Sequence, residues 1–169
     1  MKHQLTIFIC FALLAVASAK WGFMTPKNSK VHHLSKANIT EIAYSTPFVV
    51  LFFAPWCPHS IAFRPSFEKF ATDMVASIGS GDVDCTIEKE LQQIFGVMGY
   101  PTVFYFNNGN MYEYMGKRKA ADLEAWLDGG YLNATSKPLP DVNGEKKHKS
   151  DFSGLIKKMH ALADNQANQ

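Results

Sequence analysis

Six consecutive apolar residues, Phe48 to Phe53, limit what this chain can fold into more than any other stretch. A strand with one face in water alternates apolar and polar residues, whereas a continuous apolar run predicts a strand covered on both faces. We therefore expect this strand inside a sheet that has helices packed on both of its sides.

The rest of the chain alternates between strand and helix patterns that fit such a sheet. Strands are expected over residues 31–34, 82–86, 102–106 and 111–114, and helices over residues 36–44, 57–77, 88–95 and 120–127. Ser35 is the expected N-cap of the first helix, and Gly79-Ser80-Gly81 is expected to end the second. Asn107-Asn108-Gly109-Asn110 predicts a tight hairpin. The expected fold is α/β, with a central mixed sheet flanked by helices on both faces.

The first nineteen residues have the pattern of a secretory signal peptide. A basic start at Lys2 and His3 is followed by an apolar run over residues 5–17 and the small-residue pattern Ala17-Ser18-Ala19. As a helix that run rises only about 20 Å, against a hydrocarbon core of about 30 Å. We therefore expect cleavage before Lys20 rather than a membrane anchor, and no membrane span in the mature chain.

The chain has 169 residues, enough for one globular domain with some tail left over, and carries 17 Lys and Arg against 15 Asp and Glu. So small a net charge is poorly suited to a phosphate backbone, and we expect no nucleic-acid partner. The composition turns polar from about residue 133. The expected organisation is a signal peptide over 1–19, one domain over 20–132 and a polar, flexible tail over 133–169.

Two cysteines remain once Cys10 has left with the signal peptide. An oxidising compartment favours disulfide bonds. However, Cys57 opens a polar, helix-forming segment, whereas Cys85 ends a short strand-like run. We therefore expect no Cys57–Cys85 bond and a buried, free thiol at Cys85.

Five motifs follow one another along the chain at a recognisable spacing. They are Phe52-Phe53-Ala54-Pro55-Trp56-Cys57-Pro58-His59-Ser60, Val83-Asp84-Cys85-Thr86, Phe95-Gly96-Val97, Gly99-Tyr100-Pro101-Thr102 and Tyr114-Met115-Gly116-Lys117-Arg118. Over about residues 30–130 the chain resembles the protein disulfide isomerase branch of the thioredoxin superfamily. The resemblance implies a single thioredoxin-like domain that acts on the thiols and disulfides of other proteins.

The chemistry expected at Cys57 follows from its place before a helix. At that position the free N–H groups of His59 and Ser60 and the positive helix end favour thiolate over thiol. A protonated His59 and the Ser60 hydroxyl would add to this effect. Pro58 is tolerated because the first helical N–H has no partner. We therefore expect a reactive thiol with a lowered pKa.

Ser60 is the main departure from the family pattern, because it stands where a second cysteine is usual. A dithiol site frees itself from a mixed disulfide by attack of its second thiolate, which Ser60 cannot supply. The surviving outcomes are isomerisation, completed by a thiol of the client, and a long-lived mixed disulfide. Leu51 stands where the family commonly has a buried acid that serves the second cysteine, which is consistent with loss of the dithiol reaction.

The resemblance implies further site residues. It implies a cis peptide before Pro101, opposite Cys57, where a client chain can lie as an added strand. Trp56 and Tyr100 are expected to line this client groove with Pro101. Arg118 matches an arginine that can swing toward the thiol, although a solvated loop charge is an equal alternative.

The primary hypothesis is a monothiol disulfide isomerase, and the alternative is a non-enzymatic chaperone or retention module that captures client cysteines. A third reading keeps the fold only as a scaffold in a secreted effector or adhesion protein. The expected partners are cysteine-containing clients and glutathione. The expected location is the endoplasmic reticulum lumen or outside the cell, although the last residues are not a K-D-E-L-type signal.

Other polar features have simpler interpretations. Asn38 and Asn133 begin acceptor sequons for N-glycosylation, and Asn133 is the better placed because it follows the last helix. His32 and His33 are adjacent in an expected strand and should point to opposite faces, so we expect no metal site there. No cofactor motif is present in the sequence.

Overall fold

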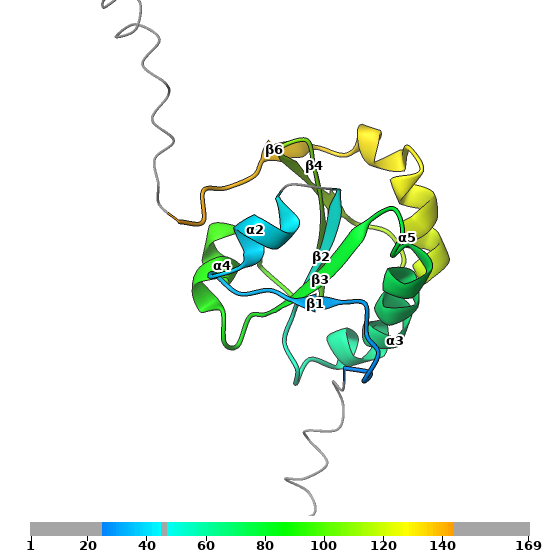
Figure 1. Ribbon diagram of the computed structural model, residues 1–169, viewed down its shortest axis with the longest axis horizontal. Coiled ribbons are helices and arrows are strands. Elements are labelled where there is room, and N and C mark those ends of the chain that lie inside the picture. The colour runs from blue at the N-terminus through cyan, green and yellow to red at the C-terminus, as the bar shows by residue number, and fades with distance from the viewer. Residues whose placement is uncertain (1–24, 45–46, 144–169) are drawn as a thin grey trace, which may run out of the picture.

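The computed structural model describes residues 25–44 and 47–143, and within them a six-stranded mixed sheet has the order β1-β3-β2-β4-β5-β6 (Figure 1). The strands are β1 His32–His33, β2 Phe48–Phe53, β3 Gly79–Asp84, β4 Thr102–Asn107, β5 Asn110–Tyr114 and β6 Ser136–Pro138. The helices are α2 Ile39–Ala43, α3 Pro58–Asp73, α4 Lys89–Ile94 and α5 Ala120–Leu127, followed by the 3-10 turn η1 Gly130–Asn133. The predicted α/β fold is confirmed.

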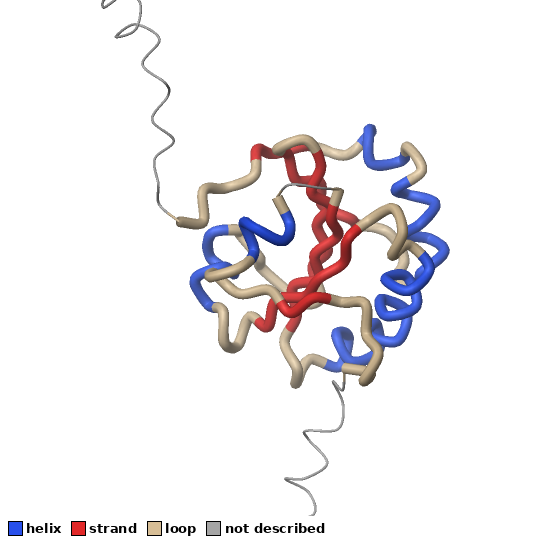
Figure 2. The backbone as a smooth tube through the Cα atoms, viewed as in Figure 1, coloured by secondary structure: helices blue, strands red, loops and turns tan. Residues whose placement is uncertain are grey.

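Strand β2 lies inside the sheet, as its sequence predicts. It pairs in parallel with β3 and antiparallel with β4, and all six of its side chains are buried. Figures 1 and 2 show α2 and α4 on one side of the sheet and α3 and α5 on the other. Alternate β2 side chains therefore enter two separate cores: Phe52 packs with residues of α2 and α4, and Leu51 packs with residues of α3 and α5.

Gly79, Ser80 and Gly81 form the first half of β3, so the prediction that they end a helix was wrong. Helix α3 already ends at Asp73. A Cβ atom on Gly79 would lie 2.2 Å from the Phe48 ring, and one on Gly81 would lie 2.7 Å from a Leu34 methyl group. These glycines thus allow close approach between neighbouring segments, a use that glycine also has inside strands.

The start of α2 also differs from the prediction. The N-cap residue is Asn38 and not Ser35. The Asn38 side chain accepts a hydrogen bond from the Ser35 N–H at 2.7 Å and donates to the His33 carbonyl oxygen at 3.1 Å. These bonds hold residues 35–38 as a turn ahead of the helix.

The hairpin and the last helix agree closely with their predictions. Asn108 and Gly109 both have positive φ angles, 50° and 76°, as the tight turn between β4 and β5 requires. Helix α5 has the expected bounds, residues 120–127.

The folded unit extends past the expected boundary at residue 132. Strand β6 pairs with β5, and Val142 is buried in the core under α2 and α4. Residues 133–143 are therefore part of the fold rather than of a tail, because they cover an edge of the sheet. The expected signal peptide and the rest of the expected tail lie outside the described residues, and no described helix is long and apolar enough to cross a membrane.

Candidate active site

Cys57 occupies the N-cap position of α3, with extended backbone angles, and Pro58 takes the first helical position. The Cys57 N–H donates to the Ala54 carbonyl at 3.0 Å, which closes the turn between β2 and α3. The turn places the sulfur over the free N–H groups of the first helical turn. The Cys57 residue is buried, with 8% of its surface exposed.

The pKa of Cys57 lies below its ordinary value. Burial is the largest single influence and raises the pKa, but the lowering influences together outweigh it. They are the donors that face the sulfur, namely the Ser60 N–H, the Ser60 hydroxyl and the His59 N–H, together with the positive charge of Arg118. At standard geometry none of these donors is hydrogen-bonded to the neutral thiol. The site thus favours the thiolate through the helix N-terminus and one nearby cation.

Ser60 is fully buried beneath the sulfur. Its Oγ atom has no hydrogen-bond partner at standard geometry among the described residues, yet its hydroxyl lowers the pKa of Cys57. The two observations agree if the hydroxyl turns toward the sulfur once the thiolate forms, because a hydroxyl hydrogen rotates freely. The buried position of Ser60 places an oxygen where a dithiol reaction would need a second sulfur.

Tyr100 and Pro101 lie opposite Cys57, joined by the expected cis peptide bond. The Cys57 thiol donates to the Tyr100 carbonyl oxygen, with 3.5 Å between sulfur and oxygen. The Trp56 ring meets the Tyr100 ring edge to face, with 6.2 Å between ring centroids. Trp56, Tyr100 and Pro101, three of the residues expected at the site, therefore lie together beside Cys57.

Arg118 is exposed and lines a hollow of about 320 Å³ that also includes Tyr100, Pro101 and Met115. Its positive charge contributes to the lowered pKa of Cys57, and a swing of its side chain toward the thiol remains a prediction. The exposed His59 contributes its backbone N–H, and a contribution from its ring remains a prediction.

Exposed apolar side chains flank the same site. Six large hydrophobic residues are mostly exposed in the described part of the chain, and four of them lie in loops at this end of the sheet: Trp56, Ile87, Met98 and Met115. Met98 lies two residues before Tyr100, and Met115 shares the hollow with Arg118. Grouped exposed apolar residues commonly mark a surface that contacts another molecule.

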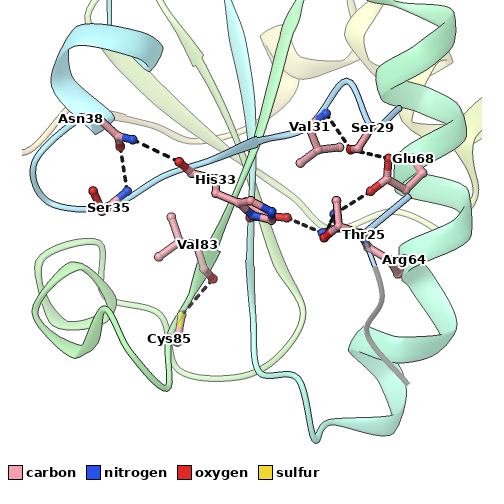
Figure 3. Close-up of polar contacts among 11 residues, drawn as sticks. Thr25, Ser29, Val31, His33, Ser35, Asn38, Arg64, Glu68, Val83 and Cys85 are labelled. Atoms are coloured by element: carbon pink, nitrogen blue, oxygen red, sulfur yellow. Dashed lines mark hydrogen bonds and ion pairs between the residues drawn. The ribbon is translucent and has the colours of Figure 1, made fainter. Parts of the chain in front are cut away.

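A buried ion network lies behind the site, and sequence reasoning missed it. Leu51 is fully buried, and its register partner on β3 is Asp82, whose buried carboxylate pairs with Arg64 of α3. Arg64 lies 2.5 Å from Glu68, which accepts a hydrogen bond from the Ser29 hydroxyl at 2.7 Å (Figure 3).

A sequence signal for this network did exist. Ser60, Arg64 and Glu68 recur every four residues and therefore share one face of the helix. It is the face that buries Phe63 and Phe67, where charged residues need partners.

The remaining expected residues are placed as follows. Cys85 is free and buried, and burial together with the charge of Asp84 raises its pKa to about 12. The His33 ring lies 2.6 Å from Asp82, whereas the His32 ring packs near Phe48. The two histidines therefore have different neighbours.

Comparisons with known proteins agree with this arrangement. The Thioredoxin family profile matches residues 30–129. The chain is 38% identical over 109 residues to a protein disulfide-isomerase of Drosophila melanogaster, covering 62% of this chain and 21% of that protein. It is 36% identical over 126 residues to a protein disulfide-isomerase of Oryctolagus cuniculus, covering 70% of this chain and 24% of that protein.

Two solved structures are also similar. Human ERp44 superposes with a TM-score of 0.57 at 27% identity, covering 62% of this chain and 30% of that one. Full-length ERdj5 superposes with a TM-score of 0.56 at 29% identity, covering 62% of this chain and 15% of that one. The chain thus spans about a quarter or less of the length of the two curated relatives.

Proposed function

Because the chain belongs to the thioredoxin family, we propose that it performs thiol–disulfide exchange on proteins folding in the secretory pathway, with Cys57 as its nucleophile. The observation that carries the proposal is the placement of the Cys57 sulfur between the N-terminus of α3 and the Tyr100 carbonyl. Its lowered pKa supplies thiolate, which is the attacking form in exchange.

The proposed reaction is isomerisation. The Cys57 thiolate attacks one sulfur of a client disulfide, forms a mixed disulfide with it, and releases the other client sulfur as a thiolate. A client thiolate then attacks the client sulfur of the mixed disulfide and expels the Cys57 thiolate. One disulfide enters and one leaves, so no external oxidant or reductant is needed.

Ser60 shapes the lifetime of the mixed disulfide. A second cysteine at this position would attack Cys57 within the same molecule, at a high effective concentration. The Ser60 hydroxyl stabilises the thiolate but cannot form a disulfide. Release must therefore wait for a client thiol or for a small thiol such as glutathione.

The exposed apolar side chains support a partly unfolded client. A cysteine that reaches Cys57 brings its neighbours against Trp56, Met98 and Met115. Methionine side chains adapt to many shapes, which suits clients of varied sequence. Together with the expected signal peptide over residues 1–19, this supports action in the endoplasmic reticulum lumen or outside the cell.

The alternative is a capturing module, favoured by the slow release that Ser60 imposes. Scrambled ribonuclease distinguishes the two functions, because only an isomerase restores its activity at substoichiometric amounts. Acid trapping and non-reducing gels would detect covalent complexes in either case. Cys57→Ala should abolish both signals, and Lys69→Ala, an exposed change on the same helix, should leave them unchanged. Mixed disulfides that persist in Cys57→Ala would contradict both functions.

A further inference from the structure

A hollow of about 610 Å³ lies beside the end of β5. Its walls come from β5 and the loop after it, from α5, and from the segment that leads to β6. The volume falls in the range of about 300–1,000 Å³ that is usual for ligand sites. The thiol chemistry proposed for Cys57 makes no use of this hollow, so a different occupant has to be found for it.

The hollow exists because β6 covers only part of β5. The pairing between the two strands ends at Tyr112 and Ser136, although β5 continues to Tyr114. The chain leaves α5, passes through η1 and only then reaches β6 (Figure 1). The outer side of Glu113 and Tyr114 therefore has no strand partner in the described part of the chain. Such an open strand edge invites pairing with other chains unless something covers it.

A glycosylation sequon forms part of the wall of this hollow. All three of its residues, Asn133, Ala134 and Thr135, line the hollow. Asn133 and Thr135 are exposed, and Asn133 is the last residue of η1. A sugar attached to the Asn133 side chain would therefore start at the wall of the hollow rather than out in solvent.

The lining offers the two kinds of surface that a sugar ring needs. Trp126 of α5 lines the hollow and is held by edge contacts with three tyrosine rings, of which Tyr114 is the nearest at 5.2 Å between centroids. The C–H groups on one side of a pyranose ring can pack on the negative face of such an indole. The exposed Glu113 and Lys137 supply a hydrogen-bond acceptor and a donor for the sugar hydroxyls.

We propose that the chain carries an N-glycan on Asn133 and that its first N-acetylglucosamine docks in this hollow against Trp126. The glycan comes from a lipid diphosphate donor: a bond forms between sugar C1 and the Asn133 Nδ2, the amide loses one proton, and the lipid diphosphate leaves. The attachment holds the sugar at a high effective concentration, so a weak contact is enough for docking. The docked sugar fastens the segment before β6 and covers the open edge of β5.

The test uses the full chain made in a secretory host that adds high-mannose glycans. Endoglycosidase H leaves a single N-acetylglucosamine on the asparagine, and peptide mass mapping locates it. This one-sugar protein should have a Tm about 2–6 °C above that of Asn133→Gln, because the sugar stabilises only the folded chain. Nuclear Overhauser contacts should join sugar protons to the Trp126 indole in the folded protein and disappear in urea.

Two variants show whether the gain in Tm comes from the hollow. Trp126→Leu should remove the difference in Tm between the one-sugar protein and its Asn133→Gln counterpart, because leucine has no aromatic face. Leu132→Ala is the matched control: Leu132 is next to Asn133, is 70% exposed and is not part of the lining, so the difference should persist. If Trp126→Leu does not fold, the Overhauser contacts in the otherwise unchanged protein still decide.

Several results would overturn the proposal. They are an unmodified Asn133, a Tm equal to that of Asn133→Gln, a gain in Tm that survives in Trp126→Leu, and a sugar without contacts to the indole. Faster exchange with a protein client in Asn133→Gln, at unchanged Tm, would assign the hollow to clients instead. None of these measurements involves Cys57. A protein that shows the docked sugar but exchanges with no client would therefore refute the proposed function alone.

Discussion

A short pulse of iodoacetamide at pH 7 is expected to alkylate Cys57 at least about 30 times faster than Cys85, a ratio worked from their ionisation. The pKa of Cys57 lies below 9.0, so more than about 1% of it is thiolate at pH 7. With a pKa of about 12, Cys85 is only about 0.001% thiolate. The thiolate populations therefore differ by at least about 1,000-fold.

Intrinsic nucleophilicity acts in the opposite direction and decides the final ratio. A more basic thiolate attacks faster. For a difference of three pKa units and a Brønsted slope of about 0.4–0.5, the Cys85 thiolate is about 16–30 times more reactive than the Cys57 thiolate. The population effect is larger, which leaves Cys57 ahead by about 30–60-fold. The deeper burial of Cys85 widens this ratio.

Mass mapping of acid-quenched, digested protein measures the two rates, and the same pulse in urea supplies the unfolded control. Ser60→Ala should slow the labelling of Cys57 at pH 7 by up to about tenfold. The labelling slows because the lost hydroxyl no longer stabilises the thiolate. The pKa of Cys57 therefore rises, and less thiolate is present at neutral pH. Comparable labelling of both cysteines in the folded protein would refute this reasoning, and so would an unchanged rate in Ser60→Ala.

Three further predictions concern the second sulfur, the buried ion network and glycosylation. Ser60→Cys should make insulin reduction by dithiothreitol measurable, and adding Leu51→Glu should speed it, because a buried carboxylate can take the second proton. No reductase gain in either variant would contradict the role given to Ser60. Arg64→Met should lower the free energy of unfolding in urea by about 3–5 kcal/mol by leaving Asp82 buried without its guanidinium partner, and Arg64→Met/Asp82→Leu should recover most of that loss. A single-variant loss under about 1 kcal/mol would show that the pair is not effectively buried. In secretory expression Asn133→Gln should remove the glycosidase-sensitive mass shift, whereas Asn38→Gln should leave it unchanged, since the Asn38 amide is already engaged in two hydrogen bonds.

Local patterns were sufficient to predict much of the fold. The apolar run of β2, the turn at Asn108 and Gly109, and the bounds of α5 each depend on residues close together in the sequence. The position of Cys57 ahead of α3 was likewise predictable from residues close to it in the sequence. Its expected N–H donors, on His59 and Ser60, are indeed the ones that lower its pKa.

The tertiary structure decided whatever depends on distant partners. The glycines of β3 suit a strand because Phe48 and Leu34 press against them. Residues 136–138 form a strand because the edge of β5 is there to pair with. Neither fact is visible in the local sequence, where the same residues are typical of turns and tails.

The same division holds at the candidate site. The sequence by itself indicated that one sulfur stands at a helix N-terminus and that a serine, Ser60, follows it three residues later. Only the fold brought Asp82 to Arg64 across 18 residues and Tyr100 to Cys57 across 43. The physical reason is that hydrogen bonds and charge pairs form between groups that are close in space. Residues far apart in the sequence become close only when the sheet and helices pack together.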